Sequence, residues 1–418
     1  MKKLLIIFTV LLAVTTGVTG VSAFGSAGPL GPFPLQGEYD EITPRPLPEG
    51  AQMFDRYLAI GGDASMGAQG ESVDETRQRW SFPKRIAEQV GTPFNQAVVS
   101  FPGYFFNMED VAKGNIRWHQ YYSHLTTGFR KLSNVDQDTL HNFSIAGSTV
   151  FTALKASGFN GGFYELVLGA SGRPMVRQAL DRTPTFISVY FGINDLMSAI
   201  EQCDIGELND VIPDYATLFE SIKLNEKKNG GSIQGVLVGN IPDITSMPFL
   251  VEDLTPGAPE GSLKAFYSAE TDSSTRLTPK DMAVIQEARK EINKFIEVSA
   301  EQNGWALVDM DKVFSDAKAN GRYLLKPGWE PSEIKFNARY LGGLFCLDGV
   351  NPSITGSAVI ANYCIEAINH TYGTSISNVD EFETRRSDTL YLKPYDPRPF
   401  LHRGVFGKLK FYYDNINL

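Results

Sequence analysis

At residues 57–67 the chain reads Tyr-Leu-Ala-Ile-Gly-Gly-Asp-Ala-Ser-Met-Gly, a short apolar strand followed by a turn of small residues. An apolar run of this length is typical of a buried strand, and glycines directly after it let the backbone turn sharply and expose the next side chain. A hydroxyl exposed at such a turn is a frequent nucleophile, but here the position falls on Asp63. Ser65 is the alternative nucleophile if the turn carries inserted residues.

Strand and helix patterns alternate along the rest of the chain. Strands are predicted at 142–145, 185–191, 232–239 and 305–308, and helices at 80–90, 150–156, 214–228, 278–304 and 354–369. This alternation predicts an α/β fold, with a mostly parallel sheet and helices on both faces. Ligands of such folds bind beyond the carboxyl ends of the strands, so we expect the turns at 61–67, 146–148 and 192–195 to converge there.

The two ends of the chain differ in composition from the middle. Residues 1–23 combine Lys2 and Lys3, an apolar run and a Val-Ser-Ala ending, which predicts a signal peptide and export to the periplasm, the outer membrane or the medium; an uncleaved anchor stays open. Residues 24–53 form a Pro/Gly-rich lead-in, and 54–373 the main domain with an insertion near 94–141. The aromatic-rich extension at 374–418 is either a strap on the domain or a docking segment for a protein partner.

Charge and cysteine usage set further limits. The formal net charge of -10 argues against nucleic acid as a partner, because phosphate binding requires clustered Lys and Arg. Cys203, Cys346 and Cys364 match no zinc pattern. A Cys346–Cys364 disulfide and two free thiols are both open alternatives.

Four blocks of the chain resemble the SGNH, or GDSL, hydrolase family. These are residues 57–67, Gly147, the Gly-Ile-Asn-Asp of 192–195 and the Asp-Gly-Val-Asn-Pro of 348–352, in the family's order and approximate spacing. Short segments at 94–96, 240–243 and 358–362 are similar to the exported bacterial branch of this family. The resemblance covers roughly residues 54–373 and implies a flavodoxin-like three-layer fold. It also implies ester hydrolysis, as in esterases and lipases, without a cofactor or metal.

The resemblance assigns roles residue by residue. In the family a Ser attacks the ester, a Gly N–H and an Asn amide help to hold the oxyanion, and a His oriented by an Asp moves the proton. The oxyanion donors survive as Gly147 and Asn194, and the orienting acid as Asp348. Asp63 replaces the Ser and Asn351 replaces the His, and an amide cannot exchange a proton near neutral pH. We therefore expect the Asp63 carboxylate to fill the oxyanion hole.

Two functional interpretations follow from these replacements. The first is an inactive member of the family that binds an acyl or other small-molecule ligand in the old active-site pocket, or serves as an assembly component. The second is a residual esterase or lipase that uses Ser65 or a relocated base. None of the five histidines lies in the last block, so a base would have to come from elsewhere; they are His119, His124, His141, His370 and His402.

Three other interpretations of the same residues stay open. Asp63 and Asp348 can form a carboxylate pair of the kind glycosidases use. With Asn194 and Asn351 they also provide oxygen ligands suited to a hard cation such as calcium. In the purely structural interpretation, Asp63 binds the N–H groups of its own turn and Asn351 caps the helix that begins near residue 353.

Overall fold

The computed structural model describes residues 51–390, with gaps at 71, 102, 104–108, 110–138, 203–204, 229–231, 266–275 and 320. The predicted signal peptide, most of the lead-in, most of the 94–141 insertion and residues 391–418 lie outside the described residues. Among the helices that the structure describes, none has both the length and the apolar character that crossing a membrane requires.

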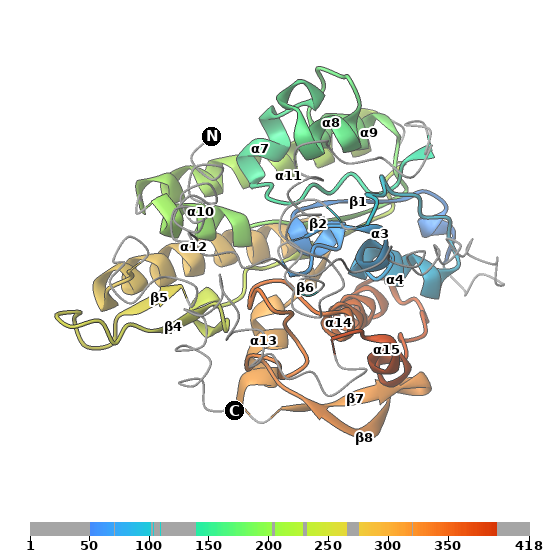
Figure 1. Cartoon of the computed structure of the whole chain (residues 1–418). Helices are drawn as coiled ribbons and strands as arrows, with labels where there is room; N and C mark the ends of the chain where they lie inside the picture. The colour runs from blue at the N-terminus through green and yellow to red at the C-terminus, as the bar shows by residue number, and fades with distance from the viewer. Residues whose placement is uncertain are drawn as a thin grey trace, which may run out of the picture.

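A parallel sheet forms the centre of the described chain (Figure 1). Its strand order is β1-β2-β3-β6, and every residue of the first three strands is buried. Buried parallel strands favour β-branched, aliphatic and aromatic side chains, which these segments supply. The four strands are β1 (Tyr57–Gly61), β2 (Phe186–Tyr190), β3 (Gly235–Gly239) and β6 (Ala306–Val308).

The segment 141–145 extends this sheet along the free edge of β1. The Ala59 N–H donates to the His141 carbonyl at 2.9 Å, and the Phe143 N–H donates to the Ala59 carbonyl at 2.8 Å. The Ile145 N–H then donates to the Gly61 carbonyl at 3.0 Å. With this segment counted as the second strand in the chain, the order across the sheet becomes 2-1-3-4-5, the flavodoxin-like order. The predicted α/β fold is confirmed.

Helices cover both faces of the sheet (Figure 1). On one face lie α4 (Phe82–Val90) and α14 (Ile354–Tyr372), and on the other α9 (Met175–Asp181), α11 (Val211–Lys228) and α12 (Pro279–Asn303). The predicted caps of α12 are confirmed: the Thr278 hydroxyl accepts from the Asp281 N–H, and Gly304 ends the helix in the left-handed conformation.

Several elements were not predicted from the sequence. Two antiparallel hairpins lie outside the main sheet, β4 (Leu250–Glu252) with β5 (Leu263–Ala265) and β7 (Arg322–Lys326) with β8 (Glu330–Phe336). The unpredicted α-helices include α2 (Asp63–Met66), α3 (Glu75–Gln78), α8 (Gly162–Leu168), α10 (Ile193–Gln202), α13 (Met310–Ala319) and α15 (Glu381–Ser387), whereas α7 (Val150–Lys155) lies where a helix was predicted at 150–156. Short 3-10 turns occur at Ala51–Phe54, Gly158–Asn160, Ile205–Asp210, Ile244–Ser246 and Pro327–Trp329.

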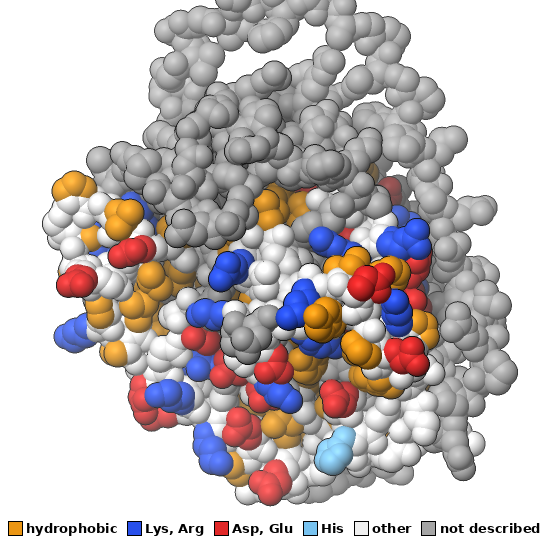
Figure 2. All heavy atoms as spheres, turned by 90° about the horizontal axis from the view of Figure 1, so that it is seen from below, with side chains coloured by type: hydrophobic (Ala, Val, Ile, Leu, Met, Phe, Trp, Pro, Cys, Tyr) orange, Lys and Arg blue, Asp and Glu red, His pale blue; other side chains and the backbone are white. Residues whose placement is uncertain are grey.

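The first part of the predicted extension packs on the domain through α15. Glu381 is fully buried and accepts hydrogen bonds from the Arg322 guanidinium at 2.8–3.1 Å and from the Asn362 amide at 2.8 Å. Residues 374–390 therefore join α14 to the β7–β8 hairpin. Seen from below, the described surface intersperses acidic, basic and apolar side chains, so no charge of one sign dominates it (Figure 2).

Candidate functional site

Asp63 lies where β1 ends and α2 begins. The two preceding glycines permit this sharp entry: a Cβ on Gly61 would collide with the Ser65 side chain and lie 2.7 Å from the Tyr190 carbonyl oxygen, and a Cβ on Gly62 would lie 2.9 Å from the Asn194 amide nitrogen. The glycines thus let α2 fold back closely on the sheet. The half-buried Asp63 side chain is thereby held at the carboxyl edge.

The Asp63 carboxylate fills the predicted oxyanion hole. Its Oδ2 accepts a hydrogen bond from the Gly147 N–H at 2.9 Å and a second, very short one from the Asn194 side-chain amide. The same Asn194 nitrogen also donates to the Ser148 carbonyl at 3.1 Å, which orients the amide. The expected contact between Asp63 and both donors is confirmed. The roles that the family would give these residues stay predictions.

The third block, predicted as a turn at 192–195, is a turn at Gly192 followed at once by the start of a helix. Gly192, with φ of 104°, makes the turn, and α10 begins at the next residue, so Asn194 and Asp195 lie in its first turn. A Cβ on Gly192 would collide with the Ile241 side chain, so glycine is required there. The helix start fixes the direction in which the Asn194 amide points.

Asp195 is a buried part of the site that the sequence did not single out. Its carboxylate accepts the Val150 N–H at 3.1 Å and 3.3 Å, and so joins the start of α10 to the start of α7. Burial raises the pKa of Asp195 to about 7, against the lowering effect of the backbone N–H groups of Val150, Asp195 and Gly192. In the sequence, only its position directly after Asn194 indicates that Asp195 lies at the site.

In the fourth block, hydrogen bonds hold Asn351 against Asp348. The Asn351 side-chain amide donates to Asp348 Oδ2 at 3.0 Å, and the backbone N–H groups of Val350 and Asn351 donate to Asp348 Oδ1 at 2.9 Å and 2.7 Å. The expectation that Asn351 caps the following helix is wrong. Ser353 is the cap, because its hydroxyl accepts the Gly356 N–H at 2.9 Å.

Ser65, the alternative nucleophile, does not lie in the hole. It is 1% exposed and its hydroxyl packs beneath Gly61, on the side of α2 that faces the sheet. Its carbonyl accepts from the Asn142 amide at 2.9 Å, which anchors this part of α2 to the 141–145 segment. The Ser65 hydroxyl is therefore buried against Gly61 and not exposed at the turn.

The described histidines lie near the amino ends of the strands, away from the carboxyl edge where Asp63 is found. His141 precedes its strand, and its Nδ1 accepts from the Asn95 N–H at 3.1 Å; burial lowers its pKa. His370 lies in the last turn of α14, next to Tyr372, whose hydroxyl bonds to the backbone of Val236 near the start of β3. His119, His124 and His402 lie outside the described residues.

Three of the four carboxylate oxygens required for a carboxylate pair or a cation site already accept hydrogen bonds from the protein. Both oxygens of Asp348 accept N–H groups, and Oδ2 of Asp63 accepts two. Within the described ranges there is no group of three or more His, Cys, Asp or Glu side chains that could hold a metal. A metal ion held by both carboxylates would therefore have to displace hydrogen bonds to Asp348.

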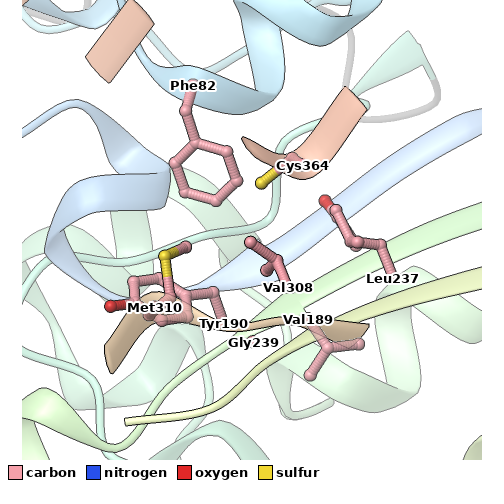
Figure 3. A pocket seen from close by; sticks show the side chains of 9 residues that line it. Phe82, Val189, Tyr190, Leu237, Gly239, Val308, Met310 and Cys364 are labelled. Atoms are coloured by element: carbon pink, nitrogen blue, oxygen red, sulfur yellow. The ribbon is translucent and has the colours of Figure 1, made fainter. Parts of the chain in front are cut away.

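The two described cysteines are buried free thiols. Cys346 lies beside the fourth block, where its Sγ accepts the Gly70 N–H at 3.0 Å, and burial raises its pKa well above the usual range. Cys364 lines a small apolar void between the sheet and the helices α4 and α14 (Figure 3). Phe82, Tyr190 and Met310 line the same void, which leaves no room for a water molecule. It is a packing gap in the core and not a ligand pocket.

Comparison with known proteins gives structural neighbours only. No protein-family model and no curated protein matches the chain. About 75% of it aligns with 95% of a putative GDSL-like lipase from Parabacteroides merdae (13% identity, TM-score 0.35) and with 98% of an extracellular lipase from Streptomyces rimosus (15% identity, TM-score 0.36). An acetylxylan esterase from Geobacillus stearothermophilus aligns over 94% of its length and 75% of this chain (14% identity, TM-score 0.31).

Proposed function

We propose that this chain is an SGNH/GDSL-hydrolase-like protein that no longer hydrolyses esters and acts as a ligand-binding or assembly component. The observation that carries the proposal is the Asp63 carboxylate on the Gly147 N–H and the Asn194 amide. A carboxylate held in this way resembles a trapped product acid. It occupies the place where a substrate carbonyl oxygen would have to bind.

The proton-transfer half of the reaction is also missing. Asn351 makes the hydrogen bond to Asp348 that would orient an imidazole, but an amide neither accepts nor returns a proton near neutral pH. The alternative esterase would need Ser65 to leave its buried position. The geometry therefore supports an inherited frame without its two reactive groups.

Hydrolysis of p-nitrophenyl acetate and butyrate tests the proposal. We expect the wild-type chain to match the buffer rate, and the double variant Asp63→Ser/Asn351→His to gain turnover, because the donors Gly147 and Asn194 are already in place. Adding Asn194→Ala to the double variant should lower that turnover by about 10²–10³. Wild-type turnover that Ser65→Ala or Asp63→Ala abolishes would contradict the proposal.

Export and partner binding are further parts of the proposal. Export is supported by the sequence of residues 2–23, and a mature chain that begins at Phe24 would support it directly. A protein partner that binds the extension should co-purify with the full chain and be lost when the chain is cut after Leu390. Equal recovery from both forms would place the partner elsewhere.

A further inference from the structure

The residues that replace Ser and His leave acceptor atoms at the site. Both donors of the hole are used by Oδ2 of Asp63, and among the residues that the structure describes, none donates a hydrogen bond to Oδ1. Asn351 gives its amide N–H to Asp348, which leaves its own Oδ1 as an acceptor. An active hydrolase site presents the reverse, a hydroxyl and N–H donors that await an oxyanion.

Both acceptors belong to the same edge of the sheet. Asp63 follows β1 at its carboxyl end. Asn351 precedes α14, and this helix ends with Tyr372 at the amino ends of β3 and β6, where the Tyr372 hydroxyl bonds to Val236 and Ala306. The start of α14 therefore lies toward the carboxyl edge, where Asp63 is found.

The charge around the site favours a cation over a neutral donor. The Asp63 carboxylate supplies this charge at the hole itself. Burial raises the pKa of the adjacent Asp195 to about 7, and Asp214 on α11 and Asp210 on the Ile205–Asp210 turn are the acidic groups that lie beyond it. Lys155, at the end of α7, opposes the charge of Asp214. A charge-assisted hydrogen bond is roughly twice as strong as a neutral one, so an ammonium group gains more than a hydroxyl from the Asp63 carboxylate.

An exposed aromatic ring close in sequence to Gly147 offers a contact for the rest of such a ligand. Phe151 lies in the first turn of α7, four residues after Gly147, and is 54% exposed. Aromatic rings bind both alkyl chains and cations. Phe151 therefore offers an exposed apolar surface close in sequence to Gly147, which is itself exposed.

We propose that replacing Ser by Asp63 reverses the polarity of the inherited site, so that it binds a ligand carrying a protonated primary amine instead of an oxyanion. The inference rests on the proposed function, because an active esterase would need the hole free. The ammonium group donates to Oδ1 of Asp63, and the alkyl part of the ligand packs against Phe151.

Titration of the purified full chain with n-butylammonium chloride, followed by NMR and compared with sodium butyrate at matched ionic strength, tests the inference. We expect the wild type to bind butylammonium and not butyrate, and Asp63→Asn to bind it at least about tenfold more weakly. Asp181→Asn, a partly exposed acid on α9 at the other edge of the sheet, should bind as the wild type does.

The Asp63→Ser variant provides a second readout that does not depend on the Asn variant. It should lose butylammonium binding and gain butyrate binding, since the Gly147 and Asn194 donors become free. Equal butylammonium affinity in the wild type and Asp63→Asn, or no saturable binding to the wild type, would overturn the inference. Ester hydrolysis by the wild type would instead overturn the proposed function, so the two failures are distinguishable.

Discussion

Replacing the buried Asp195 by Asn should remove much of the pH dependence of folding stability. The carboxyl has a pKa of about 7 in the folded protein and about 3.8 in its ordinary state. Between these values the unfolded chain has released its proton while the folded chain still holds it. Stability contributed by this group is therefore present at low pH and is lost as the pH rises through the folded pKa.

The size of the effect follows from the pKa difference. A difference of about 3 pKa units corresponds to about 4 kcal/mol of unfolding free energy lost between low pH and pH 8, of which about 2.5 kcal/mol is lost between pH 5 and pH 8. The amide introduced by Asp195→Asn would be neutral at every pH, and its oxygen can accept the Val150 N–H as the carboxylate does at 3.1 Å.

Urea denaturation of the wild type and Asp195→Asn at pH 5 and pH 8 measures this directly. The wild type should lose about 2.5 kcal/mol more stability than the variant across that interval. The acidic neighbour Asp214 is present in both proteins, so its titration largely cancels in the comparison. Parallel pH profiles for the two proteins would refute the reasoning, as would a larger loss in the variant.

Three further outcomes are expected. Glu381→Gln should lower the free energy of unfolding by about 3 kcal/mol in urea denaturation, because it leaves the partly buried Arg322 guanidinium without its counter-charge. The control Glu383→Gln, on the exposed side of the same helix, should change that free energy by less than about 0.5 kcal/mol. Gly61→Ala should lower the free energy of unfolding by about 3 kcal/mol, because the new methyl group would collide with α2 and β2. Gly147→Ala meets no atom within 4 Å and should lower it by about 1 kcal/mol, because only its φ of 79° is unfavourable. Equal losses for the two variants would contradict this assignment. In a Cys203→Ser chain, the two remaining buried thiols should react with a thiol reagent only after denaturation, and rapid labelling of the native protein would count against their burial.

Much of the sheet could be predicted because its strands carry a strong local signal. Residues 186–190 and 235–239 are short apolar segments that are buried at every position, as a central parallel strand requires. Helix α12 was marked by its Thr278 cap and by Gly304. The contact of Asp63 with Gly147 and Asn194 was expected because strand order brings their turns to one edge.

Other features had no such signal. Strand β8 reads Glu-Pro-Ser-Glu-Ile-Lys-Phe and buries only two of its seven side chains, so its pairing with β7 depends on tertiary contacts. The sequence predicts Asn351 as the cap of α14, but its amide donates to Asp348 and the Ser353 hydroxyl accepts the Gly356 N–H instead, contacts that residue type alone does not show. The raised pKa of Asp195 results from its burial, and the polar residues next to it in the sequence do not indicate that this carboxyl is buried.

The filled hole also changes what holds the carboxyl edge together. Asp63, Gly147 and Asn194 follow three adjacent strands of the sheet, and one carboxylate oxygen connects all three. In an enzyme, preorganised donors of this kind remain unsatisfied by protein at rest, at some expense in stability. Here the same groups form a cross-link within the protein, so they stabilise the carboxyl edge of the sheet independently of any reaction.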